Sequence, residues 1–160
     1  MRITTKGRYA IRAITNLALS DTDKPKPIKL IAQEEGISPE FLEQIFFRLK
    51  KTGIISSVRG PGGGFRIAKS HEEINVKDIF EAVGEGVDLT PCTCEPDSAN
   101  ELPKNPNAYT AAGCNRKDIC LVTDIWQQAS QYIQDYFTQL TLAKIVASIK
   151  SGHTDPILQP

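Results

Sequence analysis

Apolar residues in the first part of the chain recur with the period of a helix, in short blocks separated by turn residues. The residues predicted to share the face of the first helix are Ala10, Ala13, Ile14, Leu17 and Ala18, and the helix is expected to start after Thr4 and Thr5, either of which can cap it. The proline-bearing segment 21–27 interrupts this pattern. A second, shorter helix is expected over 28–35, with Gly36 at its end.

The third block carries helix signals at both of its ends. Ser38 suits the N-cap, Pro39 suits the first helical position, and Glu40 adds an acidic side chain to the first turn. Gly53 closes the block. The apolar stripe expected to dock on a core is Leu42, Ile45, Phe46 and Leu49. Two helices joined by a turn of about three residues form a helix-turn-helix.

After this block the pattern changes from helical to extended. Branched residues over 54–58 and alternation over 65–67 predict the two strands of a hairpin, and the glycine-rich loop 59–64 joins them. A further helix is expected over 75–83, where the apolar residues again follow a helical period. A helix-turn-helix followed by a hairpin predicts a winged helix, with the loop as its wing.

Regular patterning stops between 84 and 117, and 95–113 is expected to form a long loop because it carries three prolines. A long amphipathic helix then begins at Ile119 or Leu121 and runs to Thr138. Its apolar face is Leu121, Ile125, Trp126, Ala129, Tyr132, Ile133, Tyr136 and Phe137. One small winged helix cannot cover this much apolar surface, so we expect a partner subunit there.

The charge of the chain is divided between its two halves. The net charge of the 160 residues is zero, but residues 1–70 hold 13 lysines and arginines against 6 acidic residues, and residues 71–160 hold 6 against 13. A basic half suits a polyanionic partner; the alternative is a chance division. No stretch approaches the ~18 apolar residues of a membrane helix, and the first ten residues have no apolar signal core. We expect a cytoplasmic protein without membrane contact.

A helix-turn-helix with a wing is suited to double-stranded DNA, because a helix fits the major groove and basic groups meet the phosphates. The polar side chains at the start of the third helix, which can face base edges, are Ser38, Glu40, Glu43 and Gln44. At the wing, Arg59 suits a narrow minor groove, and Gly60, Pro61 and Gly62 let the backbone approach another surface closely. The alternative is that these side chains belong to an ordinary solvated face.

The residues give little support for an enzyme. His71 and His153 are the only histidines, and no serine or cysteine has an evident histidine and acidic partner. A nucleotide phosphate cradle is not expected either, because Phe65 and Arg66 follow the last glycine of the loop, where such a site needs lysine and then serine or threonine. We expect no catalytic residues and no small-molecule substrate.

The four cysteines lie in the irregular region, at Cys92, Cys94, Cys114 and Cys120. In a cytoplasmic protein such a group favours metal binding or redox sensing over structural disulfides. Their spacing lacks the C-x2-C pairs of common zinc sites, and loosely spaced thiolates suit an iron–sulfur cluster. The spacing alone leaves a cluster, zinc and redox-active free thiols open.

Three segments resemble the IscR family of winged-helix transcription regulators, whose members include NsrR and CymR. They are Met1–Ala10 (MRITTKGRYA), Leu42–Gln44 (LEQ) and Ser56–Gly64 (SSVRGPGGG), and the last of these, the wing motif, is highly specific. The resemblance covers residues 1–92 and 113–148. It implies a homodimer that is joined by the long helix after the cysteines and binds a partly palindromic DNA site.

The resemblance also implies a cofactor. In IscR-like members three cysteines and one further residue hold a [2Fe–2S] cluster, and Cys92, Cys114 and Cys120 match the three cysteines. On the same basis the implied DNA contacts are Glu43, Gln44 and Arg59.

The chain departs from the family pattern in two places. The gap between the first and the third cysteine is longer than in IscR itself, so 95–113 resembles an insertion. Thr123 stands three residues after the last cysteine, where IscR has a ligating histidine. The fourth cluster ligand is therefore open between Cys94, Asp124 and a residue of the partner subunit.

Together these observations predict a mainly α fold in four parts. They are a winged helix-turn-helix DNA-binding domain over 1–83, a cluster-binding loop over 84–118, a dimerisation helix and a short C-terminal helix capped by Thr141 over 119–150, and a tail over 151–160. The predicted function is a dimeric transcription regulator, acting as a repressor, whose operator binding an iron–sulfur cluster controls. The alternatives are the same fold with a thiol or zinc switch and no cluster, and a small iron–sulfur electron carrier.

Overall fold

The structure, a computed structural model, describes residues 3–20, 24–86, 89–90 and 119–152. Contacts divide the chain into two units. The first unit contains Ile3–Gly86 together with the residues from Tyr136 onward, and the second contains the residues from Val87 to Asp135. The first unit holds every element of the predicted winged helix.

Three helices open the first unit, and local caps set their ends. They are α1 (Thr5–Leu19), α2 (Ile28–Glu35) and α3 (Pro39–Lys51). The hydroxyls of Thr4 and Ser38 each accept a hydrogen bond from a backbone N–H in the first turn of α1 and α3. Gly36 ends α2 in the left-handed conformation, with φ of 63°. The three helices predicted from the sequence are confirmed.

The wing is an antiparallel hairpin of β1 (Ile55–Val58) and β2 (Gly64–Ile67). The prediction that the first strand includes Ile54 is wrong by one residue. The backbone N–H of Ile54 donates to the carbonyl of Leu49 at 3.1 Å, so Ile54 completes the end of α3 instead. Ile55 then pairs with Ile67.

Lys26, predicted to lie in a loop, extends the sheet by one residue. Its N–H donates to the Phe65 carbonyl at 2.8 Å, and the Phe65 N–H donates back to Lys26 at 2.9 Å. Pro25 and Pro27 lack an N–H, which limits the pairing to this single residue. A Cβ at Gly64 would collide with the Lys26 carbonyl, so glycine is needed at that point of β2.

Three further helices follow the hairpin: α4 (Val76–Val83), α5 (Thr123–Gln139) and α6 (Leu142–Ser151). Asn75 and Asp78 form a reciprocal capping box at the start of α4. The hydroxyl of Thr141 caps α6 as predicted. The backbones of Asn75 and Thr141 also bridge, which joins α6 to the start of α4.

Two predicted helix bounds need correction. α5 begins at Thr123, later than Ile119 or Leu121, because the chain first makes a turn in which the Thr123 N–H donates to the Cys120 carbonyl at 3.3 Å. Ser151, predicted as the first residue of a tail, is the last residue of α6, because the helix ends only at the left-handed Gly152.

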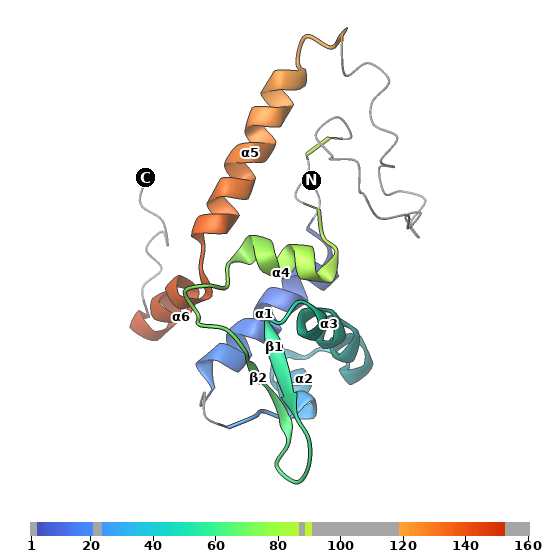
Figure 1. Ribbon diagram of the computed structural model, residues 1–160, viewed down its shortest axis with the longest axis vertical. Coiled ribbons are helices and arrows are strands. Elements are labelled where there is room, and N and C mark those ends of the chain that lie inside the picture. Colours follow the sequence, from blue (N-terminus) through green and yellow to red (C-terminus); the bar gives the residue numbers. More distant parts are fainter. Residues whose placement is uncertain (1–2, 21–23, 87–88, 91–118, 153–160) are drawn as a thin grey trace. The chain divides into compact units, whose positions relative to one another are not determined.

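One hydrophobic core joins the helices of the first unit to the hairpin (Figure 1). The four residues predicted as the apolar stripe of α3 are each no more than 1% exposed. Phe46 of α3 meets Phe65 of β2 edge to face, with ring centroids 4.9 Å apart. Gly7 of α1 lets α4 approach closely, since a Cβ there would lie 3.1 Å from the Phe80 ring. In Figure 1 the hairpin projects from the end of this unit opposite to α4 and α6.

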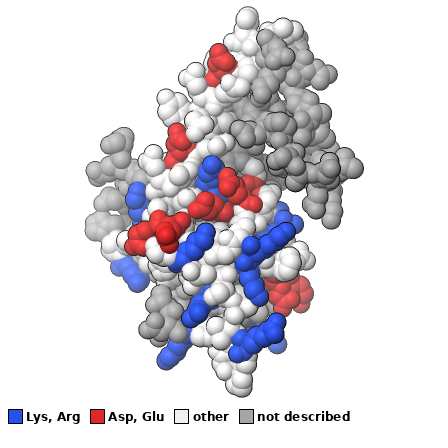
Figure 2. All heavy atoms as spheres, viewed as in Figure 1, with Lys and Arg blue, Asp and Glu red and all other residues white. Residues whose placement is uncertain are grey.

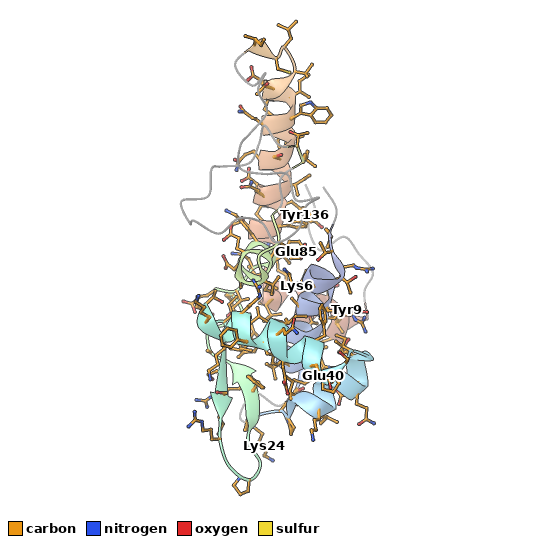
Figure 3. The ribbon with its side chains drawn as sticks, turned by 90° about the vertical axis from the view of Figure 1, so that its right-hand side faces the viewer. Lys6, Tyr9, Lys24, Glu40, Glu85 and Tyr136 are labelled. Carbon is orange, nitrogen blue, oxygen red and sulfur yellow. The ribbon has the colours of Figure 1, made fainter. Side chains whose placement is uncertain are left out.

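Glu85, which follows α4, is buried beside the start of α1 (Figure 3). Its carboxylate accepts hydrogen bonds from the backbone N–H and the hydroxyl of Thr4, and Lys6 Nζ lies 3.9 Å from it. A negative charge is favoured at a helix N-terminus. The Arg48 guanidinium of α3 donates to the carbonyl of Val83 at 3.5 Å. The end of α4 is therefore attached to both α1 and α3.

Replacing Glu85 by alanine is expected to lower the free energy of unfolding by about 1 to 3 kcal/mol, because Thr4 loses the acceptor of two hydrogen bonds. Urea denaturation measures the change. The control is Glu81→Ala, which removes an exposed helical pair with Lys77 and is expected to cost less than about 0.5 kcal/mol. Equal losses in the two variants would contradict the role given to Glu85.

Candidate nucleic-acid interface

The face of α3 that does not enter the core is exposed and polar over its first two turns. The predicted contact residues on or next to this face, all exposed, are Ser38, Glu40, Glu43 and Gln44. Among the described residues, no side-chain hydrogen bond or ion pair engages Glu43 or Gln44. Both are therefore available to a ligand. Ser38 also caps the helix, so its hydroxyl already accepts one bond from the Phe41 N–H.

The tip of the wing carries an exposed arginine on a tight glycine turn. Gly60 and Gly62 have φ of 104° and 76°, conformations that favour glycine, and the Gly63 N–H donates to the Gly60 carbonyl at 2.9 Å. Arg59, Gly60, Pro61 and Gly62 are all exposed. Within the described part of the chain no carboxylate pairs with Arg59. The guanidinium thus extends from the end of the hairpin without a protein partner there.

Further cations surround these two elements. Arg48, Lys50 and Lys51 lie in the last turn of α3. A hollow of about 300 Å³ beside β2 is lined by Lys24, Arg66, Lys69, His71 and Glu72, among others. In Figure 2 lysine and arginine side chains gather over the lower part of the first unit, where α3 and the hairpin lie. This surface suits a polyanion.

Two carboxylates near these cations remain charged at neutral pH. Glu34 pairs with Lys26, and hydrogen bonds from Lys26 and Asn16 lower the pKa of Glu34. Hydrogen bonds from its own backbone N–H and from Ser70 lower the pKa of Glu72. Lys26 is therefore neutralised within the fold, whereas no carboxylate among the described residues forms an ion pair with Lys24, Arg66 or Lys69.

Only part of the candidate cluster site falls within the described residues. Cys120 is half-buried in the turn before α5, and Asp124 is exposed in the first turn of that helix. Thr123, which stands where IscR has a ligating histidine, is buried. Thiolate and carboxylate are donor types that iron accepts, so the chemistry of these two side chains fits a cluster ligand. The remaining cysteines, Cys92, Cys94 and Cys114, lie outside the described residues, as does His153.

Helix α5 and the turn before it expose a broad apolar surface. Leu121 is 97% exposed and Tyr132 is 74% exposed, whereas the buried residues of α5 are the polar Thr123 and Ser130. The other exposed members of the predicted apolar face are Ile125, Trp126 and Tyr136. No helix among the described residues has the length and apolar character needed to cross a membrane.

Three residues that support or line the surface formed by α3 and the wing were not predicted from the sequence. Glu85 holds the end of α4, and Lys26 pairs with the sheet. Phe47 of α3 is 72% exposed. Its spacing of four residues from Glu43 places both side chains on one face of the helix, and this signal could have identified it.

Comparison with known proteins identifies similar regulators along most of the chain. The profile of the Rrf2 family, described as an iron-dependent transcriptional regulator, matches residues 3–148. The HTH-type transcriptional regulator IscR of Pectobacterium carotovorum is 39% identical over 146 residues, which cover 91% of this chain and 79% of that protein. IscR of Yersinia enterocolitica is 38% identical over the same length.

Solved structures agree with the architecture. The structure of T. potens IscR has a TM-score of 0.68 at 26% identity and covers 100% of this chain and 94% of its own. CymR, the global cysteine regulator of B. subtilis, has a TM-score of 0.66 at 22% identity and covers 92% and 97%. The predicted mainly α fold with a winged helix is therefore confirmed.

Replacing Arg59 by alanine is expected to weaken binding to duplex DNA by about 1 to 3 kcal/mol, because a groove or phosphate contact is lost. Fluorescence anisotropy at several salt concentrations measures this change. The slope of log affinity against log salt is expected to become shallower by about 1 if the arginine meets a phosphate. The control is Lys150→Ala, which removes a charge from the exposed last turn of α6. An affinity that falls equally in both variants would contradict a specific role for the wing.

Proposed function

Because this chain belongs to the Rrf2 family of iron-dependent transcriptional regulators, we propose that it is a dimeric repressor whose binding to a partly palindromic operator is controlled by an iron–sulfur cluster. The protein is a DNA-binding transcription regulator of the helix-turn-helix type and not an enzyme. In the proposal it acts in the cytoplasm, residues 1–83 bind DNA, 84–118 hold the cluster, 119–150 dimerise and 151–160 form a tail.

The exposed polar face of α3 beside a wing arginine is the observation that carries the proposal. Glu43 can accept a hydrogen bond from the amino group of cytosine, and Gln44 can pair with adenine in the major groove. Ser38 and Glu40 lie where the N-terminal end of α3 approaches base edges or phosphates. Arg59 enters the adjacent minor groove, with Gly60, Pro61 and Gly62 close to the sugar-phosphate backbone.

The apolar side chains of α5 support a homodimer. An exposed apolar surface of this extent on a regulator marks a protein interface. Two copies of this chain that bury these faces against each other would present two α3 helices related by a two-fold axis, and such an arrangement reads a palindromic site.

The cluster, proposed as [2Fe–2S], would be held by Cys92, Cys114 and Cys120, with Cys94, Asp124 or a partner residue as the fourth ligand. When bound, it supplies an iron centre whose oxidation or loss changes the charge and the ligation of these thiolates. Cys120 lies in the turn that leads into α5, so its ligation would restrain the start of the dimerisation helix.

The segment that carries the cysteines can also affect α3 from its N-terminal end, which follows α4. At this end the Glu85 carboxylate accepts a hydrogen bond from Thr4 of the α1 cap. Two residues earlier, the carbonyl of Val83 accepts a hydrogen bond from Arg48 of α3. Restraining the chain beyond Glu85 can bias these contacts. The cluster then acts through different DNA affinities of the restrained and the relaxed state.

A winged-helix regulator with a zinc or thiol switch is the second candidate. Two features of the sequence favour this candidate. Thr123 cannot replace a histidine ligand of iron, and Cys94 provides a fourth cysteine. Four thiolates also suit zinc. An iron–sulfur electron carrier would leave the wing and the basic surface without a role.

The anaerobically purified protein is expected to contain iron and acid-labile sulfide and to absorb visible light through thiolate-to-iron charge transfer. These bands should be lost in Cys92→Ala, Cys114→Ala and Cys120→Ala. Comparison of Cys94→Ala with Asp124→Ala identifies the fourth ligand, and retention of the bands in both points to a partner residue. A colourless protein that contains zinc, or no metal, would contradict the cluster and favour the second candidate.

Replacing Glu43 by alanine is expected to relax the base preference at one position of each half-site, because a hydrogen bond to cytosine is lost. Selection of duplexes from a random library by the wild type and the variant measures this preference. The matched control is Glu81→Ala, which removes an exposed acid from α4. An unchanged preference in Glu43→Ala would exclude base readout by this residue.

A further inference from the structure

Phe47 is far more exposed than any other large apolar residue that the structure describes in the winged helix. Its side chain is 72% exposed, whereas the next most exposed large apolar residue among the described residues from Ile3 to Gly86 is Leu30, at 43%. Phe46, its neighbour in the chain, is fully buried. Because α3 is anchored by an apolar stripe on its other face, Phe47 contributes nothing to that anchoring.

The position of Phe47 on α3 places it among the residues proposed to read DNA. Successive helical residues are about 100° apart, so Phe47 projects between Glu43 and Gln44 and almost directly away from the buried stripe. Lys50 and Lys51 follow one turn later and are exposed. An aromatic ring therefore stands at the centre of a polar and basic face.

We propose that Phe47 contacts the 5-methyl group of a thymine in the operator and makes α3 select thymine at that position. This inference rests on the proposed function. In the major groove the thymine methyl is the apolar group that distinguishes one base pair from the others, and phenylalanine is a side chain that can contact it. Glu43 and Gln44 would read cytosine and adenine on either side of this contact.

The surroundings of Phe47 favour DNA over a protein partner. No other large apolar residue of α3 is exposed, so the ring is not part of an apolar patch of the size that a protein interface buries. Its neighbours on the same face are charged or polar, and the cations of the last turn of α3 suit phosphates. The thymine methyl is a single apolar group among the polar base edges of the major groove, and Phe47 is a single apolar side chain among polar residues of α3. The two apolar groups can therefore contact each other while their polar neighbours form hydrogen bonds.

The test uses a duplex that the wild-type protein selects from a random library, with each thymine replaced in turn by deoxyuridine. This change removes only the major-groove methyl group and retains base pairing. At one thymine in each half-site the replacement is expected to weaken wild-type binding about fourfold, the effect of leaving one methyl group unburied. In Phe47→Ala the same replacement is expected to have no effect, and Phe47→Leu should restore part of the sensitivity.

Leu30→Ala is the matched control, because it removes an exposed apolar side chain from α2 and should retain the full deoxyuridine effect. The inference is overturned if no thymine responds in the wild type, or if Phe47→Ala responds as strongly as the wild type. Failure of the wild type to select any sequence would instead overturn the proposed function. The two failures are thus distinguishable.

Discussion

The burial of one face of α3 is the constraint on which the rest of the structure depends. Its four stripe residues are almost completely enclosed by the core, and Phe46 also contacts the ring of Phe65 in the wing. Rotation of α3 about its axis would bring Glu43 and Gln44 toward that core, and burying unpartnered polar groups is costly. The helix therefore has one orientation. Because the contact between Phe46 and Phe65 joins α3 to the hairpin, it also fixes the position of the wing, with Arg59, relative to the polar face of α3.

The features that the sequence predicts well are those set by residues a few positions apart. The predicted caps at Thr4, Ser38 and Thr141 depend on one side chain and the next turn of backbone, and all three are observed. The apolar stripe of α3 also follows from local spacing alone. These signals were enough to predict the order of helices and strands that makes a winged helix.

The features that the sequence does not reveal depend on contacts between distant parts of the chain. Glu85 binds Thr4 across 81 positions, and Lys26 pairs with Phe65 because the hairpin folds back beside it. Phe47 is missed for another reason, since a search for apolar periodicity records only the residues that enter the core. Of the proposed cluster ligands, Cys120 and Asp124 alone fall among the described residues. The ligand set is proposed from the family resemblance.

The single paired residue Lys26 has a consequence for how the protein behaves at high concentration. An exposed sheet edge offers backbone donors and acceptors to a strand of another molecule, which promotes aggregation. Here the strand beside β2 consists of one lysine between two prolines, and neither proline has an N–H to donate. On that side the wing offers no template for added strands. Self-association by strand addition is therefore disfavoured at this edge of the wing.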